Sequence, residues 1–357
     1  MGEISETYSG GTPKVSIKSF YNKKEIPFIR SSDIHKNTTE LYITKEGLEE
    51  SSAKLVSKGQ ILYALYGATS GEVDISKIDG AINQAILAIN THDNINYFIM
   101  LFLNKNKDKI IKKYIQGGQG NLSAKIVKNI NINITSKKEE KEISTFIKKF
   151  EKIFTLYEKK KQLLTQLKQG IVSSLITKNG QKSQLRFSGF NNNWESKSFE
   201  KLLNYEQPTK YIVKKADYIS QGTPVLTANK SFILGYTNEN NVYQNIPAII
   251  FDDFTLESKY VDFPFMVKSS AIKILTSKNS NLFFIYQLLN NQRFVQEGHS
   301  RHYISVVQKK KILVPSIQEQ NKIGNLIKQL ENNIEQNSDT IALLKSLKEF
   351  LLQNMFL

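Results

Sequence analysis

The chain contains no cysteine among its 357 residues. This absence excludes disulfide bonds, thiolate metal sites and cysteine nucleophiles. No run of residues approaches the roughly 18 consecutive apolar side chains that a membrane-spanning helix needs. The first residues, Met1–Glu6, lack a basic stretch followed by an apolar one, so we expect no secretory signal. Together these absences lead us to expect a globular protein of the cytoplasm.

The usual catalytic signatures are also missing. Gly10–Pro13 lacks the length and the lysine of a nucleotide-binding phosphate loop, and Gly117–Gly120 has neither the spacing nor the context of a dinucleotide-binding loop. We find no Gly-x-Ser-x-Gly nucleophile elbow and no Asp/Asn-Pro-Pro-aromatic stretch of the kind that amino-methyltransferases carry. The sequence therefore offers no strong case for catalysis by this chain.

Charge gives the first positive indication of function. The chain has 49 Lys and Arg against 33 Asp and Glu, a net charge of +16. The excess lies mainly in residues 1–138, with a net charge of +6, and residues 181–315, with +7, while residues 139–180 have +4 and residues 316–357 have −1. Such a balance favours a polyanionic partner, most simply nucleic acid. The alternative is compositional drift in a chain rich in Lys, Asn and Ile.

The sequence repeats itself. Glu139–Ile143 matches Glu319–Ile323 at an offset of 180 residues, and the match continues without a gap through both helical regions. Just upstream, Asn121–Ser123 matches Tyr303–Ser305 at an offset of 182. The chain thus consists of two copies of one unit, each a variable region followed by a helical region.

The helical regions show a seven-residue apolar repeat typical of paired helices. In the first copy, residues 139–176 would form a helix of about 57 Å at 1.5 Å per residue. One seam holds, in the two copies together, Ile143, Phe150, Tyr157, Leu164, Ile171, Ile323, Leu330, Leu344 and Leu351. The second seam position holds Phe146, Ile153, Leu167, Leu326 and Leu347. We expect the two helices to pair antiparallel within one chain; the alternative is two amphipathic helices in separate cores.

Polar residues interrupt the middle of both helices. Lys160 lies at mid-seam in the first helix, and Asn333, Asn337 and Thr340 lie there in the second. Polar seam residues can set the register of a helix pair at a cost in stability. We expect these polar middles to remain accessible.

The variable regions combine strand-like and helix-like segments. Short β-branched and aromatic runs bounded by Gly, Pro, Asn or Asp predict strands at residues 61–65, 82–89, 246–251 and 271–275. Residues 96–113 and 281–297 are predicted as helices. The expected fold is α+β: two mixed α/β domains at residues 1–138 and 181–315, joined by spacer helices at residues 139–180 and 316–357 that pair as an antiparallel coiled coil, in a pseudo-twofold repeat.

Two groups of residues give weak indications of a metal site, and each has another explanation. His299 and His302 have a spacing that could ligate a metal, but the surrounding Gly298–Tyr303 loop suits DNA contact better. Asp252, Asp253, Glu257 and Lys259 are faintly similar to a metal-dependent nuclease cluster, but an acidic surface loop is the better explanation, and a carboxylate that accepts from cytosine N4 is a further option.

Several motifs, in this order along the chain, resemble the specificity (S) subunit of a type I restriction-modification system. In the first half they are Gly10–Pro13, Ile26–Ile34, Lys58–Leu62, Tyr66–Gly71 and Ile82–Ala85. In the second half they are Arg186–Phe190 with Trp194, and Pro315 with Glu319, Gln320 and Ile323 at the entry to the long helix. The resemblance covers essentially the whole chain, and the ordered set together with the duplication makes it specific.

The chain departs from the family pattern in two places. The second half opens with Arg186–Trp194 ahead of Phe199, whereas the first half starts near the equivalent of Phe199, so we interpret the first domain as N-terminally shortened. The second variable region has no clear copy of Tyr66–Thr69. We therefore expect it to belong to another recognition-domain subtype with its own target.

The resemblance implies a non-catalytic subunit that binds double-stranded DNA, each variable domain reading one half of a split sequence. The paired helices would separate the two halves and dock modification (methyltransferase) and restriction (motor-nuclease) subunits, on which S-adenosylmethionine, ATP and Mg²⁺ are expected; this chain would bind no cofactor or metal of its own. The alternatives left open are a metal-dependent DNA endonuclease and a helical adaptor that does not bind DNA.

Polar loop residues are the candidates for DNA contact, because Arg, Asn and Gln suit base edges and Lys suits phosphates. In the first domain they are Arg30, Ser32, Tyr66, Thr69, Ser70, Gln119, Asn121 and Lys125. In the second domain they are Thr227, Asn229, Lys230, Ser300, Arg301, His302 and Tyr303. The candidates for partner docking on the helices are Ile143, Phe150, Tyr157, Leu164, Ile323, Leu330 and Leu344.

Overall fold

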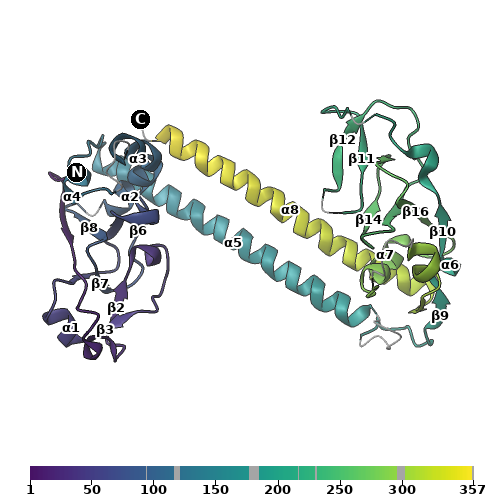
Figure 1. Cartoon of the computed structure of the whole chain (residues 1–357), viewed down its shortest axis with the longest axis horizontal. Helices are drawn as coiled ribbons and strands as arrows, with labels where there is room; N and C mark the ends of the chain where they lie inside the picture. The colour runs from purple at the N-terminus through teal and green to yellow at the C-terminus, as the bar shows by residue number, and fades with distance from the viewer. Residues whose placement is uncertain are drawn as a thin grey trace. The chain divides into compact units, whose positions relative to one another are not determined.

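The computed structural model describes residues 1–93, 95–115, 121–176, 185–215, 217–229, 231–295 and 302–355. The chain divides into two compact units: unit 1 is Met1–Leu156 with Ile341–Leu357, and unit 2 is Tyr157–Thr340. Two 39-residue helices, α5 (Lys137–Leu175) and α8 (Ile317–Met355), each contribute to both units (Figure 1). Neither these helices nor any other in the described ranges is long and apolar enough to cross a membrane.

The first module, the part of unit 1 ahead of α5, contains two four-stranded sheets. The first has the order β1 (Ser5–Ser9), β8 (Ile86–Thr91), β5 (Ile61–Ala64) and β6 (Val73–Ile75). The second has the order β3 (Tyr42–Ile43), β2 (Ile26–Ile29), β7 (Gly80–Ile82) and β4 (Lys54–Val56). The short helices are η1 (Lys18–Tyr21), η2 (Ser31–Asp33), α1 (Lys45–Glu49), η3 (Gly67–Thr69), α2 (Asn96–Lys105), α3 (Lys107–Ile115) and α4 (Ala124–Lys128).

The second module, the part of unit 2 between the long helices, has three sheets. They are, in spatial order, β10 (Leu203–Glu206), β16 (Ile272–Ser277), β13 (Ala248–Asp252) and β14 (Ser258–Val261); then β12 (Ile233–Thr237), β11 (Thr223–Leu226) and β15 (Met266–Val267); then β17 (Lys311–Val314) and β9 (Glu195–Ser198). Its helices are α6 (Phe199–Leu202), η4 (Pro208–Tyr211), α7 (Leu282–Asn290) and the π-helix η5 (Tyr303–Val307).

The two modules share one strand topology. The antiparallel order β1-β8-β5-β6 recurs as β10-β16-β13-β14. The three strands β3-β2-β7 recur as β12-β11-β15, with an antiparallel and a parallel pairing in the same places. The duplication that the sequence reveals in the helices thus extends through both modules, and the predicted α+β fold with an internal repeat is confirmed.

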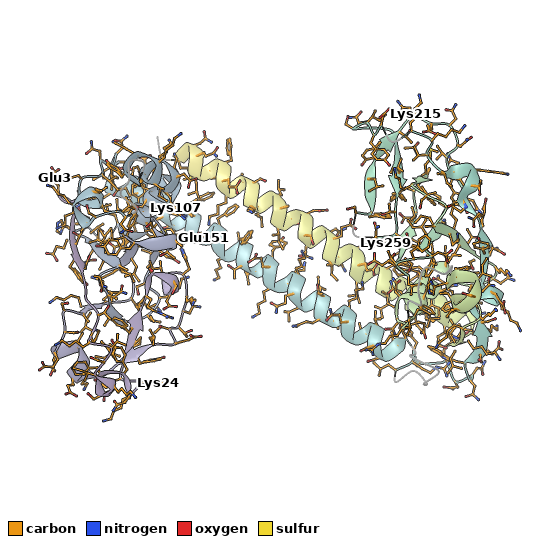
Figure 2. The ribbon with its side chains drawn as sticks, viewed as in Figure 1. Glu3, Lys24, Lys107, Glu151, Lys215 and Lys259 are labelled. Carbon is orange, nitrogen blue, oxygen red and sulfur yellow. The ribbon has the colours of Figure 1, made fainter. Side chains whose placement is uncertain are left out.

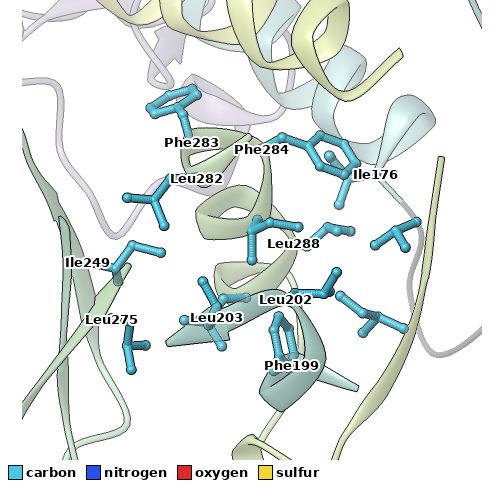
Figure 3. Close-up of a cluster of buried hydrophobic side chains, with 14 of the residues drawn as sticks. Ile176, Phe199, Leu202, Leu203, Ile249, Leu275, Leu282, Phe283, Phe284 and Leu288 are labelled. Carbon is cyan, nitrogen blue, oxygen red and sulfur yellow. The ribbon is translucent and has the colours of Figure 1, made fainter. Parts of the chain in front are cut away.

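Buried β-branched and aromatic runs build the sheets. All five residues of β13 are buried, and the first four, residues 248–251, form the apolar run from which the strand was predicted. In unit 2, side chains of β13 and β16 meet α7 and the residues that open α6, as Ile249, Leu275, Leu282 and Phe199 show in Figure 3. The end of α5 and the start of α8 close the same core, with Ile176 and Ile323 buried.

The long helices run antiparallel. In unit 1, Lys348 of α8 pairs with Glu151 of α5 at 2.7 Å between Nζ and Oε1. In unit 2, Glu331 of α8 pairs with Lys168 of α5 at 2.5 Å. Residue numbers fall along one helix as they rise along the other, so the predicted antiparallel pairing is confirmed.

The second predicted seam is wrong in α5, whereas its residue Leu326 in α8 does pack against the core of unit 2. Phe146, Ile153 and Leu167 are between 45% and 51% exposed. Ile147 and Ile327 are fully buried instead, each four residues from a seam residue. At 3.6 residues per turn, a helix that packs on a broad module core buries the i+4 position, whereas a strict seven-residue seam describes only a narrow helix pair.

The polar middle of α8 is partly closed. Asn337 is only 4% exposed, and its Nδ2 donates to the carbonyl oxygen of Asn333 at 2.6 Å. The expectation that Asn337 is accessible is therefore wrong, because it faces inward from α8. Thr340 donates to the Gln336 carbonyl oxygen at 2.8 Å and so turns its hydroxyl back onto its own helix.

Candidate nucleic-acid interface

Loops of the first module meet at one edge of its sheets. Strands β2 and β7 are parallel, with Ile29 opposite Ile82, so the segments that follow them leave the sheet on the same side. The Leu65 N–H donates to the Ala85 carbonyl oxygen at 2.8 Å, which brings the segment after β5 to the same edge. The topology therefore gathers the loops that follow three strands, which is where ligands commonly bind in open sheets.

Arg30 is held in place at this edge. Its Nε donates to Oδ2 of Asp33 at 3.1 Å, and Lys36 pairs with Oδ1 of the same carboxylate at 2.8 Å. Burial alone would raise the pKa of Asp33, but the hydrogen bonds from Lys36 and Arg30 outweigh it and lower the pKa. The Arg30 side chain stays 40% exposed. It is thus a positioned cation that remains available to a ligand, whereas Ser32, between these residues, is simply exposed.

The predicted residues Tyr66, Thr69, Ser70 and Asn121 come together in the structure. Oδ1 of Asn121 accepts from the Gly67 N–H at 3.4 Å, which ties the segment before α4 to the η3 turn. The hydroxyls of Thr69 and Ser70 donate to the carbonyl oxygens of Tyr66 and Leu65, each at 3.3 Å. Tyr66 remains 38% exposed. Three of these polar side chains therefore shape the turn, and Tyr66 is the one that it presents.

The glycine-rich segment at residues 10–13 lies against the same edge. A Cβ on Gly10 would come within 1.8 Å of the Ile82 carbonyl oxygen, so only glycine fits there. Thr12 donates through its hydroxyl to Oε1 of Gln84 at 2.9 Å. The glycines therefore let this segment pack tightly against the module itself, and Gly11 is buried there. The sequence pattern does not predict this contact between Gln84 and Thr12.

A histidine joins two of these loops. His35, just after η2, places Nε2 at 3.0 Å from Oε2 of Glu72 and Nδ1 at 3.1 Å from Oδ2 of Asp74. Lys107 of α3, which Figure 2 labels, pairs with Glu72 at 2.6 Å. The hydrogen bond from Lys107 is the main reason that the pKa of Glu72 is lowered. The turn that carries Thr69 and Ser70 is thus fixed from two sides.

In the second module, the predicted residues of the β11–β12 turn support the turn itself. Thr227 is only 8% exposed. Its hydroxyl donates to Oδ1 of Asn229 and lies 3.0 Å from the Ser231 carbonyl oxygen. Thr227 therefore does not present its side chain at the surface, whereas Asn229 is exposed at the tip.

The prediction that His302 and Tyr303 contact DNA is wrong for their side chains. Both are 1% exposed. His302 Nδ1 lies 3.1 Å from the Asp253 carbonyl oxygen, and the Tyr303 ring stacks on Tyr205 with centroids 5.4 Å apart. These residues anchor the chain inside the module, His302 through its contact with the Asp253 backbone and Tyr303 through the area that its ring buries.

Five of the residues predicted to contact DNA remain to be placed. Lys125 is exposed on α4, separate from the contacts above. Gln119, Lys230, Ser300 and Arg301 lie outside the described residues.

The acidic cluster of the second module is structural. Oδ1 of Asp252 accepts from the backbone N–H groups of Phe254 and Thr255, at 2.8 and 3.0 Å, and so caps the β13–β14 turn. Asp253 forms an ion pair with Lys273 at 3.2 Å, and both side chains are 1% exposed. Within the described ranges, no three His, Asp or Glu side chains are grouped to hold a metal ion. The geometry therefore gives the nuclease reading no support.

The helix residues predicted for partner docking divide into two groups. Ile143, Phe150, Ile323 and Leu330 are buried at 8% exposure or less, so the prediction that they contact a partner is wrong: they close the two module cores. Tyr157, Leu164 and Leu344 are half-buried. The exposed apolar side chains of the helices in unit 1 are instead Phe146, Ile153, Leu156, Leu343, Leu347 and Phe350.

Comparison with known proteins assigns both modules to one protein family. The family model of the type I restriction modification DNA specificity domain matches residues 1–166 and again residues 191–346. The chain belongs to this family and carries its domain twice.

Two kinds of relatives agree with this assignment. The specificity subunit of the Escherichia coli type I restriction enzyme EcoR124I/EcoR124II is 50% identical over 123 residues, which are 32% of this chain and 30% of that protein. The chain thus matches about a third of the length of that relative. The S subunit of a type I restriction-modification system from M. genitalium has the same fold, with a TM-score of 0.67 at 14% identity over 100% of this chain and 94% of that one. A structure of the type I R-M system, described in terms of complex assembly and conformational transition, follows with a TM-score of 0.55 at 12% identity, covering 99% and 96%.

Proposed function

We propose that this chain is the specificity subunit of a type I restriction-modification complex and that each module reads one half of a split DNA sequence. The observation that carries the proposal is the repeated strand topology, which presents a different set of loops from the same sheet edge in each module. Two modules that recognise different half-sites need the same sheet scaffold to bind DNA in the same way and different loops to contact different bases. The net charge of +16 supplies the sequence-independent attraction to phosphates.

In the first module, Arg30 and Tyr66 are the side chains that we assign to DNA contact. Arg30 is oriented by Asp33 and still 40% exposed, which suits the bidentate contact that arginine makes with guanine. In the second module, Asn229 is exposed at the β11–β12 turn and is the side chain that corresponds to Arg30, because β11 takes the place of β2 in the repeated topology. Lysines around these loops meet phosphates and set the salt dependence of binding.

The exposed apolar face of the unit 1 helices is the proposed docking surface for the modification subunit. Leu343, Leu347 and Phe350 follow one another at spacings of four and three residues and so share a face of α8. This chain then contributes binding alone. The partner subunits would hold S-adenosylmethionine, ATP and Mg²⁺, flip the target adenine and cut the DNA.

The test is methylome sequencing of cells that express this chain with its modification subunit. We expect a split methyl-adenine motif that depends on this chain. Arg30→Ala should relax one or two bases of a single half-site, since a base contact is worth about 1–3 kcal/mol of discrimination. Lys24→Ala is the matched control, because exposed Lys24 precedes β2 while Arg30 follows its other end (Figure 2). A motif that Arg30→Ala leaves unchanged would refute the role of Arg30, and no motif from a soluble complex would refute the function.

A further inference from the structure

Unit 1 has a cavity of about 660 Å³ that is lined by residues of β6, α2 and α5. Cavities that hold a ligand in proteins are commonly about 300–1,000 Å³. Apolar side chains of β6 and α2 form part of the lining. Three lysines from separate segments form another part: Lys58 in the β4–β5 turn, Lys77 after β6, and Lys148 of α5.

The two carboxylates that line this cavity already have partners. Asp74 pairs with Lys77, at 3.2 Å between Oδ2 and Nζ. Glu151, which Figure 2 labels, accepts from the Tyr97 hydroxyl at 2.6 Å and pairs with Lys348 at 2.7 Å. These contacts within unit 1 satisfy both carboxylates, so neither of them neutralises the two remaining lysines.

Lys58 and Lys148 therefore give the cavity an excess of positive charge. Nζ of Lys148 lies 4.5 Å from the centroid of the Tyr97 ring, a cation–π contact that positions the ammonium group without cancelling its charge. Lys58 is exposed. In the part of the chain that the structure describes, no carboxylate lies within ion-pair distance of either lysine.

The second module has a related cavity of different charge. It measures about 580 Å³ and is lined by residues of β14, α7 and α8. Lys328 of α8, 180 residues after Lys148, lies 5.3 Å from the centroid of the Tyr260 ring. Its ammonium group is 3.4 Å from Asp262, and the other residues that line this cavity are uncharged. The repeat thus keeps a lysine on a tyrosine, but of these two cavities the one in the first module has the unpaired charge.

The cavity of the first module adjoins the loops assigned to DNA contact. His35 lines the cavity and also places Nε2 at 3.0 Å from Oε2 of Glu72. Glu72 follows the η3 turn, which presents Tyr66. The cavity and the loop edge therefore share His35, and a DNA duplex bound at the loops has its phosphates beside the two unpaired lysines.

We propose that Lys58 and Lys148 bind backbone phosphates of the DNA duplex whose bases the neighbouring loops contact. This inference rests on the proposed function and adds a positioning contact to it. Lysine binds phosphate as a point charge, and phosphate contacts fix the register and orientation of a protein on the duplex. Residues of β6 and α2 supply an apolar wall for the deoxyribose between phosphates.

The experiment uses the complex of the full chain with its modification subunit. Its affinity for a fluorescein-labelled duplex is measured by anisotropy between about 50 and 200 mM salt, because each phosphate contact contributes about 0.9 to the slope of log K against log salt. Lys58→Gln with Lys148→Gln should reduce the slope by about 1.8, whereas Lys58→Arg with Lys148→Arg should preserve it. Lys45→Gln with Lys149→Gln is the matched control. These exposed lysines of α1 and α5 lie outside the cavity, so removing the same charge should change the slope by less than about 0.5.

The single variant Lys58→Gln keeps the test decisive if a substitution on α5 impairs assembly, and it should reduce the slope by about 0.9. A slope that the glutamine variants reduce no more than the control pair does would overturn the phosphate site, while DNA binding by the unaltered complex would stand. An equal reduction in the arginine variant would also overturn it, because charge would then not be the cause. If the unaltered complex binds no DNA, the proposed function fails and the phosphate site fails with it.

Discussion

Removing the Arg186 side chain should destabilise unit 2 strongly. The Glu319 carboxylate is fully buried and accepts from both Nε and Nη2 of Arg186, and the Arg186 side chain itself is only 26% exposed. Arg186→Met would leave this carboxylate buried without its charge partner, which costs about 3–5 kcal/mol. Because a quarter of the arginine reaches solvent, we take the lower end, about 3 kcal/mol. With a urea m-value of about 2–3 kcal/mol/M, the unfolding midpoint should fall by about 1–1.5 M.

The single tryptophan makes this measurement specific. Trp194 lies in unit 2, with its ring 6.4 Å from that of Phe284, so its fluorescence in urea reports this unit and not the other. The double variant Arg186→Met with Glu319→Gln should regain at least about 1 kcal/mol over Arg186→Met, because the uncompensated charge is gone. Lys197→Met breaks an exposed ion pair and should shift the midpoint by less than about 0.4 M. A shift of that small size for Arg186→Met, or a double variant no more stable than the single one, would refute the reasoning.

Three further predictions concern substitutions at Glu140, at Gly10, and at Leu343 together with Leu347. Burial raises the pKa of Glu140, so the stability that its protonated carboxyl contributes is present at acid pH and is lost as pH rises through the raised pKa. Glu140→Gln should therefore increase the melting temperature by about 2–4 °C at pH 7 and leave it unchanged near pH 4. A change in melting temperature that does not depend on pH would contradict this. Gly10→Ala forces a Cβ onto the Ile82 carbonyl and should abolish recognition of one half-site while the other survives, as methylome sequencing would show; an intact motif would contradict the tight fit. The double variant Leu343→Asp with Leu347→Asp should prevent co-purification with the modification subunit. It should lower the melting temperature by no more than about 2 °C, because both side chains are already exposed. If the complex still co-purifies, this face of α8 is not the docking surface.

The long-range organisation of the fold could be predicted from the sequence because it is periodic. The heptad pattern at residues 139–176 lies within two residues of both ends of α5, although the spacer boundary at residue 180 was placed beyond Leu175, where α5 ends. The strand runs fall on β5, β13 and β16. Periodicity could not say which apolar positions face the cores. Phe146 and Ile147 are neighbours of similar hydrophobicity, and only the breadth of the surface against which α5 packs decides that Ile147 is buried and Phe146 is not.

The candidate interface could be predicted in part. Arg30 and Tyr66 lie in loops bounded by strand-like runs, and the loops that follow neighbouring strands come together at a sheet edge. His302 and Tyr303 were predicted to be exposed because polar residues in a Gly-containing stretch usually lie in surface loops. Their burial depends on contacts with Asp253 and Tyr205, in segments 50 and 98 residues away from Tyr303, which the local sequence does not show. The equivalent strands of the two modules could be predicted as separate runs, such as β5 and β13, but their order in the sheets could not, because many side-chain combinations satisfy the same sheet.

The way the units share their helices bears on the order in which the chain folds during synthesis. Unit 2 is one continuous stretch, Tyr157–Thr340, whereas unit 1 needs both the first 156 residues and the last 17. Leu351, Leu352 and Met355 pack against the core of unit 1. N-terminal domains usually fold first on the ribosome. Here the N-terminal module cannot complete its apolar core until the last turns of α8 have been made, so its final packing is a late step of folding.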